Sequence, residues 1–381
     1  ICYSPPTFIV AHAVKKQILT CKTVRYPNAT DSSLESLRYG DVIINALPTK
    51  IVRYENPLNN NIIKYQIEFI SPTGESFTTK PKTPIEIVSE LRMRSSVYKP
   101  RVAEEALNAI LNGAQRDRKI STVQQIDTPG FYYVDGKIVS SGLKSPNSPS
   151  IENLRKCAEF LNELIIRSKH PEILVSEIKW GMLAPFSFVF KQLSDEGRER
   201  SMPWLYLDGY TKTSKTTDGT IVLAIYRKRK DKVGLSSVNN IARLGQELCR
   251  NTFPKLIDEV KLDPKVQSDL IEAMKHAVQG QTARTKLSVT SEPIDIPALS
   301  PCIFTSNHRL PTDLALHRRF LNYYYAKDDK PEEEDIRDFE SFLKHGWDSL
   351  GTLGDFTTCY LLQHQELIIN DTDDWPIIAK T

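Results

Sequence analysis

Apolar and polar residues alternate along 41–80, the pattern of half-buried β-strands. Two turn-forming segments, NPLNNN and SPTGES, separate the strand-like runs. Further along, 102–113 has apolar residues at helical spacing, and 131–139 predicts a hairpin around its Asp-Gly pair. We therefore expect a mixed, β-rich N-terminal domain over residues 1–145.

The pattern changes after 140–150, SSGLKSPNSPS, the segment whose composition is most typical of a linker. Residues 151–169 and 173–193 have apolar positions at helical spacing, so we expect a helical connector over 146–200. From residue 201 onward, strand, loop, helix and strand follow one another. This order is typical of an α/β fold with a parallel sheet.

Charge is spread unevenly along the chain. The total is +3, but 201–330 holds 20 Lys and Arg against 14 Asp and Glu, whereas 331–381 holds 3 against 12. A basic body with an acidic end suits a polyanionic partner, and it equally suits a solvated acidic surface. We expect an α/β core over 201–330 and a separate acidic C-terminal segment over 331–381.

The six cysteines stand far apart, and no two form a C-x-x-C pair. They are typical of reduced thiols in a cytoplasmic protein rather than of a disulfide framework or a zinc site. The longest apolar run, 180–190, is short for a membrane span and contains a proline. We therefore expect a cytoplasmic protein without membrane association.

A candidate phosphate-binding loop lies at 209–216, GYTKTSKT, between the apolar runs WLYL and TIVLAIY. Its spacing is that of G-x-x-x-x-G-K-[ST], except that Ser214 replaces the second glycine. Such a loop needs a buried strand before it and a helix directly behind it. Lys215 would reach the β- and γ-phosphates, and the Thr216 hydroxyl would bind Mg²⁺. The expected nucleotide-binding residues are Gly209, Tyr210, Thr211, Lys212, Thr213, Ser214, Lys215, Thr216 and Thr217.

Ser214 departs from this motif by one small side chain. We expect it to approach the phosphates provided that its φ is negative, and its hydroxyl to add a donor. The helix behind the loop is expected over 216–230, with a first turn weakened by Asp218 and Gly219. A decayed nucleotide site and a chance match in a Ser-, Thr- and Lys-rich segment are the alternatives.

Two further apolar runs end in side chains that nucleotide hydrolysis needs. TFPKLIDEV, at 252–260, brings Asp258 and Glu259: one carboxylate can face Mg²⁺ while the other orients or deprotonates water. PCIFTSNHRLP, at 301–311, brings Asn307, whose amide can touch the γ-phosphate and hold that water. By itself, an acidic pair at a strand end would more often be an exposed turn.

Two basic segments have two interpretations each. Arg318 and Arg319, in LALHRRF, either form surface salt bridges or reach the nucleotide of a neighbouring subunit as an arginine finger. The run RKRKDK, at 227–232, is expected to be a solvated charged face, with nucleic-acid contact as the alternative.

Taken in order, the G-x4-S-K-T loop, the Asp-Glu pair, the Thr-Ser-Asn run and Arg-Arg-Phe resemble the AAA+ ATPases over 201–325. The chain looks most like the superfamily 3 and minichromosome-maintenance-like replicative helicases of plasmids, viruses and archaea. The resemblance implies a P-loop α/β core, with a parallel sheet flanked by helices, in a hexameric ring that binds ATP and Mg²⁺ between subunits. By position it implies catalytic roles for Lys215, Asp258, Glu259, Asn307 and Arg319, with Arg318 as the alternative to Arg319, and metal binding by Thr216 and Asp258.

In these helicases a β-hairpin before Asn307 lines the pore, and here the corresponding interval is 276–301. Its strands would be KLSVT and PIDIPAL, and Glu292 stands at the tip, where family members usually carry a basic residue. Arg284 and Lys286 lie at the base, where they either contact the DNA backbone or have a structural role.

The sequence therefore predicts an ATPase coupled to DNA translocation or unwinding. The expected protein is a helicase in the replication of a mobile element, plasmid or virus, with single-stranded DNA in a central pore, working in the cytoplasm of the host cell. Two alternatives remain open. One is a DNA-bound AAA+ ATPase adaptor without unwinding activity, and the other is a nucleic-acid-binding module with an inactive nucleotide pocket.

Overall fold

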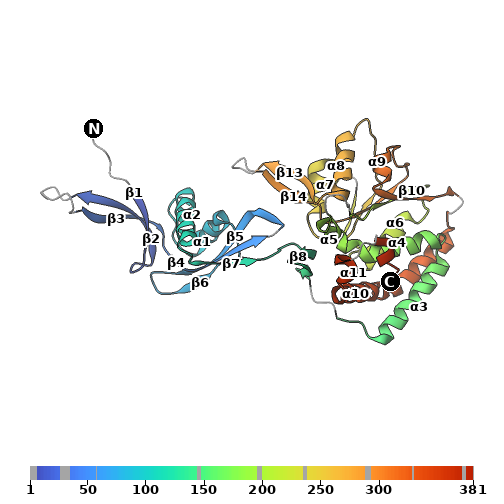
Figure 1. Ribbon diagram of the computed structural model, residues 1–381, viewed down its shortest axis with the longest axis horizontal. Helices are drawn as coiled ribbons and strands as arrows, with labels where there is room; N and C mark the ends of the chain where they lie inside the picture. Colours follow the sequence, from blue (N-terminus) through green and yellow to red (C-terminus); the bar gives the residue numbers. More distant parts are fainter. Residues whose placement is uncertain are drawn as a thin grey trace. The chain divides into compact units, whose positions relative to one another are not determined.

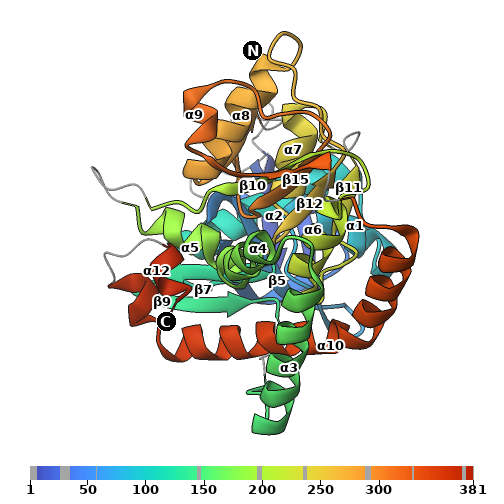
Figure 2. The same cartoon turned by 90° about the vertical axis from the view of Figure 1, so that its right-hand side faces the viewer.

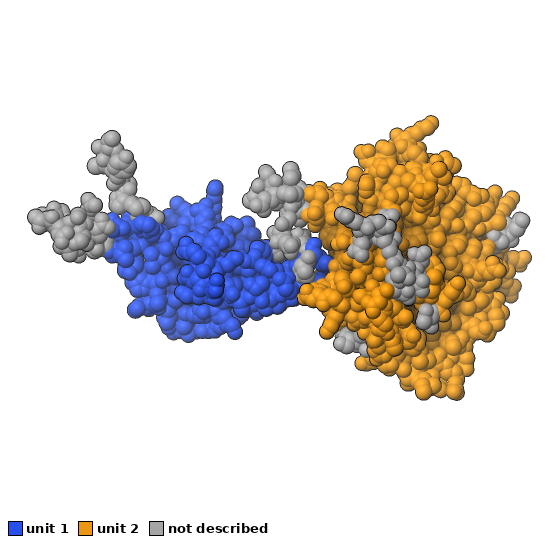
Figure 3. Space-filling view, in the orientation of Figure 1, with its two compact units in different colours: residues 1–126 blue, residues 127–381 orange. Residues whose placement is uncertain are grey.

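The computed structural model describes residues 7–25, 35–56, 58–143, 147–194, 200–234, 238–287, 293–327, 330–370 and 375–380. The chain forms two compact units, 1–126 and 127–381 (Figure 3). Each unit has its own hydrophobic core.

The described residues of unit 1 form two sheets and two helices. An antiparallel sheet is formed by β1 (Thr7–His12), β2 (Gln17–Arg25) and β3 (Glu35–Ile44). The second sheet has the order β6-β5-β4-β7 and comprises β4 (Leu47–Asn56), β5 (Asn59–Ile70), β6 (Ser76–Thr78) and β7 (Ile120–Gln124). The helices α1 (Pro84–Arg94) and α2 (Pro100–Arg116) cover one face of this second sheet (Figure 1).

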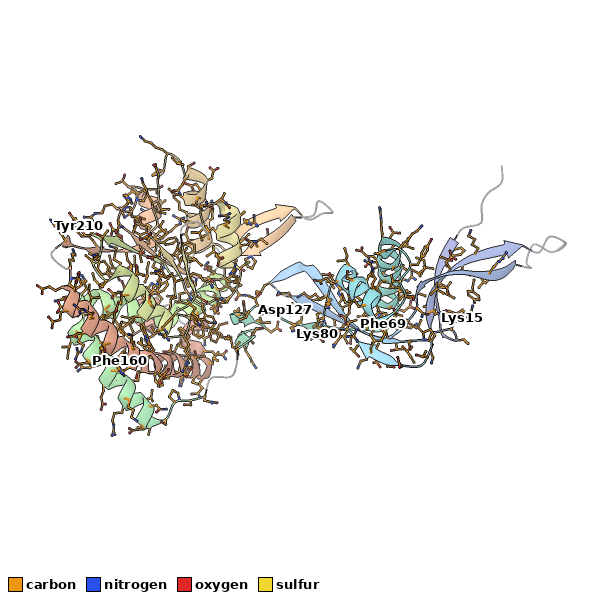
Figure 4. All side chains as sticks on the ribbon, turned by 180° about the vertical axis from the view of Figure 1, so that it is seen from behind. Lys15, Phe69, Lys80, Asp127, Phe160 and Tyr210 are labelled. Atoms are coloured by element: carbon orange, nitrogen blue, oxygen red, sulfur yellow. The ribbon has the colours of Figure 1, made fainter. Side chains whose placement is uncertain are left out.

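The core of unit 1 lies between the second sheet and its helices. Ile67 and Phe69 of β5 belong to one buried cluster with Ile87 and Leu91 of α1 and Leu107 of α2. Figure 4 shows Phe69 inside this unit. The alternation along 41–80 therefore predicted strands correctly, because every second residue of β5 enters this core.

The hairpin expected over 131–139 is present. Its strands are β8 (Gly130–Val134) and β9 (Lys137–Ser141), and its turn lies at Asp135 and Gly136, which both have positive φ. Positive φ at both turn residues is what a two-residue hairpin requires.

This hairpin belongs to unit 2, although the sequence placed it in the N-terminal domain. Phe131 stacks on Phe186 with ring centroids 4.4 Å apart, and its N–H donates to the Thr252 hydroxyl. The compact units therefore divide at 126/127 rather than at 145. Phe131 is 1% exposed and belongs to the core cluster of unit 2.

Helices follow the hairpin, as expected for 151–169 and 173–193: α3 (Ile151–Arg167), α4 (Pro171–Leu183), the 3₁₀ turn η1 (Ala184–Phe186) and α5 (Ser187–Gln192). Contrary to the expectation from 180–190, the run Pro171–Gln192 is long and apolar enough to cross a membrane. However, 72% of its apolar window is buried inside the protein, so this run is part of the core of unit 2.

A five-stranded parallel sheet of order β11-β12-β15-β10-β16 forms the centre of unit 2. Its strands are β10 (Trp204–Gly209), β11 (Lys232–Gly234), β12 (Lys255–Asp258), β15 (Cys302–Ser306) and β16 (Phe320–Tyr325). The flanking helices are α4 and α6 (Lys215–Ala224) on one face, and α7 (Ile241–Leu248), α8 (Ser268–Gln279) and α9 (Leu314–His317) on the other (Figure 2). The predicted P-loop α/β core, a parallel sheet flanked by helices, is confirmed.

Strand β10 shows why its sequence is a continuous apolar run. Leu205 and Leu207 belong to the buried cluster that contains α4, α5 and α6. Trp204 and Tyr206 belong to the cluster that contains α7, α8 and α9. Because successive side chains point to opposite faces, a strand covered on both sides has no polar face.

The hairpin before Asn307 is also present and projects from the α7–α8 side of unit 2 (Figure 1). It pairs β13 (Thr282–Leu287) with β14 (Pro293–Pro297) in antiparallel fashion. Its first strand begins earlier than the predicted KLSVT. The turn, with Glu292, lies outside the described residues.

The acidic segment 331–381 is part of unit 2. It forms α10 (Glu333–Gln363), α11 (Glu366–Ile369) and α12 (Trp375–Ile378). Phe342 of α10 stacks on Phe160 of α3 at 4.8 Å between centroids, and Figure 4 shows Phe160 where these two helices meet. The three segments expected after residue 145 thus share one compact unit.

Candidate nucleotide-binding site

A cavity of about 310 Å³ lies at the carboxyl ends of β10, β12 and β15. Ligands of open α/β sheets bind at this edge, because the loops that follow parallel strands gather there. The cavity is lined by Thr211, Lys212, Thr213, Ser214, Lys215, Thr216, Thr217, Asp258, Glu259, Thr305, Ser306 and Asn307. Three segments that are distant in sequence, each singled out by its own motif, therefore meet at one cavity.

The first two residues of the motif, Gly209 and Tyr210, precede the part of the loop that lines the cavity. Gly209 has φ +142°, and a Cβ there would lie 2.1 Å from the carbonyl oxygen of Tyr325. Glycine is therefore required at this position. Tyr210 is half exposed at the surface of unit 2 (Figure 4).

Lys215, the first residue of α6, is only 7% exposed. Its Nζ donates to Gly209 O at 3.0 Å and to Thr213 Oγ1 at 3.2 Å, and it also donates to Tyr210 O. Burial lowers the pKa of Lys215, while Asp208 and Asp258 oppose that shift. A phosphate oxygen beside this ammonium and the first N–H groups of α6 would offer a charged acceptor in place of neutral carbonyls.

Asp258, the last residue of β12, is fixed on both carboxylate oxygens. Oδ1 accepts from Thr216 Oγ1 at 2.8 Å and from the Thr305 hydroxyl, and Oδ2 pairs with Lys232 Nζ at 2.6 Å. Burial raises the pKa of Asp258, but the hydrogen bonds from Lys232, Thr305 and Thr216 outweigh burial and lower it. The carboxylate is therefore charged at neutral pH.

The Thr216 hydroxyl and the Asp258 carboxylate fit a magnesium ion. Both are hard oxygen donors, the ligand type that Mg²⁺ prefers, and they already lie 2.8 Å apart. Lys232 Nζ pairs with Asp258 Oδ2, so a divalent cation at Asp258 would compete with this ammonium.

Most of the basic run 227–232 is exposed, as expected of a solvated face, but several of its side chains also have partners within unit 2. Besides Lys232 on Asp258, Arg227 forms a bidentate pair with Asp355 at 2.8 and 2.7 Å. Arg229 lies over the ring of Trp347 at 4.5 Å. These three side chains of the run therefore contact other residues of unit 2. Sequence patterning did not single out Lys232 because its partner lies in another motif.

Glu259 and Asn307 occupy the open wall of the cavity, and both are exposed. Glu259 has φ +57°, and its N–H donates to Thr305 Oγ1 at 3.2 Å. The next N–H, that of Val260, donates to Thr305 O at 2.8 Å. Strand β15 thus fixes the turn that brings Glu259 to the cavity that Asn307 also lines.

Ser214 has φ 65° and ψ −5°, so it is in the left-handed conformation. The expectation of a negative φ is therefore wrong. A non-glycine residue pays roughly 1–2 kcal/mol for this conformation. Its hydroxyl donates to Asp218 Oδ2 at 3.1 Å, so the hydroxyl proton is engaged by a neighbour in α6.

A second cavity, of about 400 Å³, adjoins the phosphate loop and shares Lys212, Ser214 and Thr217 with the first. It lies between the end of α3, the loop and the start of α10, where Lys169 and Asp335 form an ion pair at 3.1 Å. Its other lining residues are Arg167, Ser168, Asp218, Lys330, Pro331, Glu333, Ile336, Phe339 and Glu340. Sequence reasoning missed this cavity because no short motif spans α3 and α10.

Arg318 and Arg319 are not brought to this chain's cavity. They precede β16, and Arg319 O accepts from the N–H of Trp204 at the start of β10. A six-residue strand spans roughly 20 Å, so both arginines lie at the opposite edge of the sheet. Arg318 is exposed, whereas Arg319 is partly buried and donates to Ala315 O at 2.8 Å.

Arg284 and Lys286 lie on β13, as the predicted hairpin base requires. The Arg284 side chain packs on α7, because a Cβ on Gly245 would lie 3.1 Å from its Cδ. Its Nε is buried and has no hydrogen-bond partner among the described residues. The Lys286 side chain lies outside the described residues.

No family model matches this chain, and no curated protein matches it. Among solved structures, the chain is similar to some whose descriptions name a helicase. A structure described as "SCCmec type IV Cch - active helicase" is 14% identical with a TM-score of 0.48, covering 89% of this chain and 66% of its own. The NrS-1 C-terminal region is 12% identical with a TM-score of 0.37, covering 85% of this chain and 72% of its own. The JCV helicase is 10% identical with a TM-score of 0.25, covering 74% of this chain and 70% of its own.

This chain spans less than two thirds of the first of these structures.

Proposed function

We propose that this chain is a nucleoside triphosphatase that hydrolyses ATP with Mg²⁺ and couples hydrolysis to DNA translocation or unwinding. The observation that carries the proposal is the cavity at which the phosphate loop, the two carboxylates of 258–259 and Asn307 meet. These groups supply what phosphoryl transfer requires: a cradle for the phosphates, oxygen ligands for a metal, and a base beside a water-holding amide.

The phosphate loop binds the substrate's β- and γ-phosphates through Lys215 and the first backbone N–H groups of α6. The adjoining cavity of about 400 Å³ receives the base and sugar, because it opens from the same loop and has apolar side chains such as Phe339 in its wall. Thr216 and Asp258 are the residues that would hold Mg²⁺, which offsets phosphate charge when bound.

Glu259 is the general base. It takes a proton from a water whose oxygen forms the new bond to the γ-phosphorus, while the bond from that phosphorus to the β–γ bridging oxygen breaks. Asn307, on the same wall, orients the water or the γ-phosphate through its amide. Both side chains line the cavity and are exposed.

Arg319, with Arg318 as the alternative, completes the site of a neighbouring copy. The distance between these arginines and their own cavity supports this assignment, because a head-to-tail interface would bring the two edges together and close into a ring. We propose a hexamer with single-stranded DNA in the pore, contacted by the β13–β14 hairpin with Arg284 and Lys286. The ring would act in the cytoplasm, without a membrane, in replication of a mobile element, plasmid or virus.

Phosphate release and ATP binding test the proposal, with single-stranded DNA present and absent. We expect wild-type turnover, and we expect Glu259→Gln to lower kcat by about 100-fold or more while retaining ATP. Absence of ATP binding by the wild-type chain would reject the proposal.

A forked duplex distinguishes the alternatives. Strand separation supports a helicase. DNA-stimulated turnover without strand separation favours an ATPase adaptor. ATP binding without turnover, unchanged in Glu259→Gln, favours a nucleic-acid-binding module with an inactive pocket.

A further inference from the structure

Three polar side chains are buried together behind the phosphate loop. They are Asp218 of α6, Tyr325 of β16 and Glu177 of α4, which are 2%, 0% and 0% exposed. Asp218 Oδ2 accepts from the Tyr325 hydroxyl at 2.9 Å, and that hydroxyl lies 3.1 Å from Glu177 Oε1. Ser214 joins the group, since its hydroxyl lies 3.1 Å from the same Asp218 oxygen.

The hydrogens of this group have a consistent order. A phenol carries one proton, so Tyr325 donates to one carboxyl and must accept from the other. Ser214 donates to Asp218, which makes Asp218 the acceptor of both hydroxyls and leaves Glu177 as the donor to Tyr325. Burial, followed by the nearby Asp218 charge, raises the pKa of Glu177 well above its ordinary value, as a protonated donor requires. Every hydrogen bond in the group therefore points toward Asp218.

Tyr325 connects this group to both ends of the loop. Its carbonyl oxygen accepts from the N–H of Tyr210 at 3.2 Å, directly after Gly209. Its hydroxyl reaches Asp218, which holds Ser214 at the other end. Tyr325, on the strand beside β10, thus contacts the start of the loop directly and its end through Asp218.

We propose that Asp218, supported by Tyr325 and Glu177, is a positioning residue that holds Ser214 in the left-handed conformation and thereby allows serine to replace glycine in the phosphate loop. The conformation is costly for any residue with a Cβ. A hydrogen bond from serine to a buried, oriented carboxyl oxygen offsets that cost, because hydrogen bonds in a poorly solvated site are strong. This inference rests on the proposed function only in holding that the loop binds phosphate.

The same contacts explain an apparent defect in α6. Asp218 and Gly219 are poor helix formers in the first turns of a helix. Asp218 is used for its carboxylate, and Gly219 allows close packing, because a Cβ there would lie 2.8 Å from Leu256 Cδ1 on β12. Asp218 thus supports the loop and Gly219 allows packing on the sheet, although both residues lower the helix propensity of α6.

A double-mutant cycle in the full-length chain tests the proposal through two readouts. The variants are Ser214→Gly, Asp218→Ala and the pair, and the readouts are the midpoint of thermal unfolding without nucleotide and the Kd for ATP. Glycine needs no support in this conformation. We therefore expect Ser214→Gly to raise the midpoint by about 2–4 °C in the Asp218→Ala background and to change it little in the native background.

The affinity cycle follows the same logic. Asp218→Ala should weaken ATP binding by about tenfold when residue 214 is serine, and by less than about threefold when it is glycine. Ser214→Ala should weaken binding as Asp218→Ala does, because it keeps the conformational cost and loses the hydrogen bond. Asp218→Asn, which keeps an acceptor oxygen, and Tyr325→Phe, which removes only the hydroxyl, should lie between native and Asp218→Ala.

Equal effects of Asp218→Ala with serine and with glycine at 214, in both readouts, would overturn the proposal. A merely structural role for Asp218 predicts this additivity. The unfolding cycle decides the inference even if no variant binds ATP. Failure of the wild-type chain to bind ATP would instead reject the proposed function, so the two failures are distinguishable.

Discussion

The two ends of the parallel sheet in unit 2 each bury a lysine, and they use it differently. At the carboxyl end, Lys215 donates to carbonyls and a hydroxyl of a loop that lines a cavity. At the amino end, Lys191 of α5 is 2% exposed and donates to Ala277 O at 2.5 Å and Ala298 O at 2.9 Å, at the root of the β13–β14 hairpin. Burial lowers the pKa of both lysines, and that of Lys191 falls to about 7.

The difference lies in the acceptors. Lys215 and one of its acceptors, Thr213, line a cavity, so a phosphate can reach the ammonium there. The carbonyls around Lys191 belong to Ala277 of α8 and to Ala298, between β14 and β15, and both of these residues are fully buried. A buried lysine therefore indicates a ligand site when its surroundings are accessible. It has a structural role when its acceptors are buried.

Lys215→Ala is the variant expected to have the largest effect, and it tests whether Lys215 meets a ligand. We expect ATP turnover to fall by about 1,000-fold, because the group that meets the phosphates is lost. The unfolding midpoint should change little, since loss of a buried charge offsets loss of its hydrogen bonds. Phosphate release and thermal unfolding measure both effects, and wild-type turnover would contradict the site assignment.

Arg319→Ala tests whether the edge opposite the cavity acts on another copy. We expect about a 100-fold fall in turnover with ATP binding retained. A mixture of Arg319→Ala and Glu259→Gln subunits should have a higher ATP turnover than the summed turnover of the two variants measured separately. No gain on mixing would contradict action between chains, and Arg318→Ala compared in parallel decides which arginine acts.

Lys191→Met should have the opposite profile to Lys215→Ala, with turnover without DNA nearly unchanged and stability altered. It leaves two buried carbonyls unpaired, so we expect the unfolding midpoint at pH 9 to fall by about 2 °C or more. Faster amide exchange in 282–285 would confirm that the hairpin root has loosened.

The pH dependence of this variant has a definite sign. Because the folded pKa of Lys191 is depressed to about 7, the unfolded chain binds more protons between pH 7 and the ordinary lysine value near 10.4. Lys191 therefore favours the folded state more as pH rises through this window. The midpoint difference between wild type and Lys191→Met should grow from pH 7 to pH 9.5, and a constant difference would contradict the assignment.

Lys232→Met is expected to have the smallest effect. It removes a partly exposed ion pair with Asp258, so the Mg²⁺ concentration for half-maximal turnover should fall by about threefold. Lys230→Met, an exposed residue of the same basic run, is the matched control. An unchanged Mg²⁺ requirement would show that Lys232 does not compete with the metal.

The sequence was informative wherever a local pattern determines structure. Strand alternation in 41–80, the Asp135-Gly136 turn and the α/β order after residue 201 were all predicted, because each depends on neighbours within a few residues. The three motifs around the cavity were found for the same reason. Parallel strands bring their carboxyl ends together, so separate motifs converge without any further information.

Long-range contacts were beyond such reasoning. Ser214, in its left-handed conformation, is hydrogen-bonded to Asp218, which accepts in turn from Tyr325 of another element, and Lys232 pairs with Asp258 of another motif. The boundary at 126/127 depends on Phe131 packing against Phe186, which composition at 140–150 does not reveal. Tyr325, Asp258 and Phe186 are all distant in sequence from the residues whose contacts they complete.

The close approach of Gly209 to Tyr325 has a consequence for how related chains are recognised. At this position even a methyl group would collide with the adjacent strand, whereas position 214 carries a hydroxymethyl group. Database patterns that demand both glycines would therefore pass over proteins built like this one. A pattern that keeps the first glycine and pairs a serine at the second with an acidic residue four positions later would retrieve them.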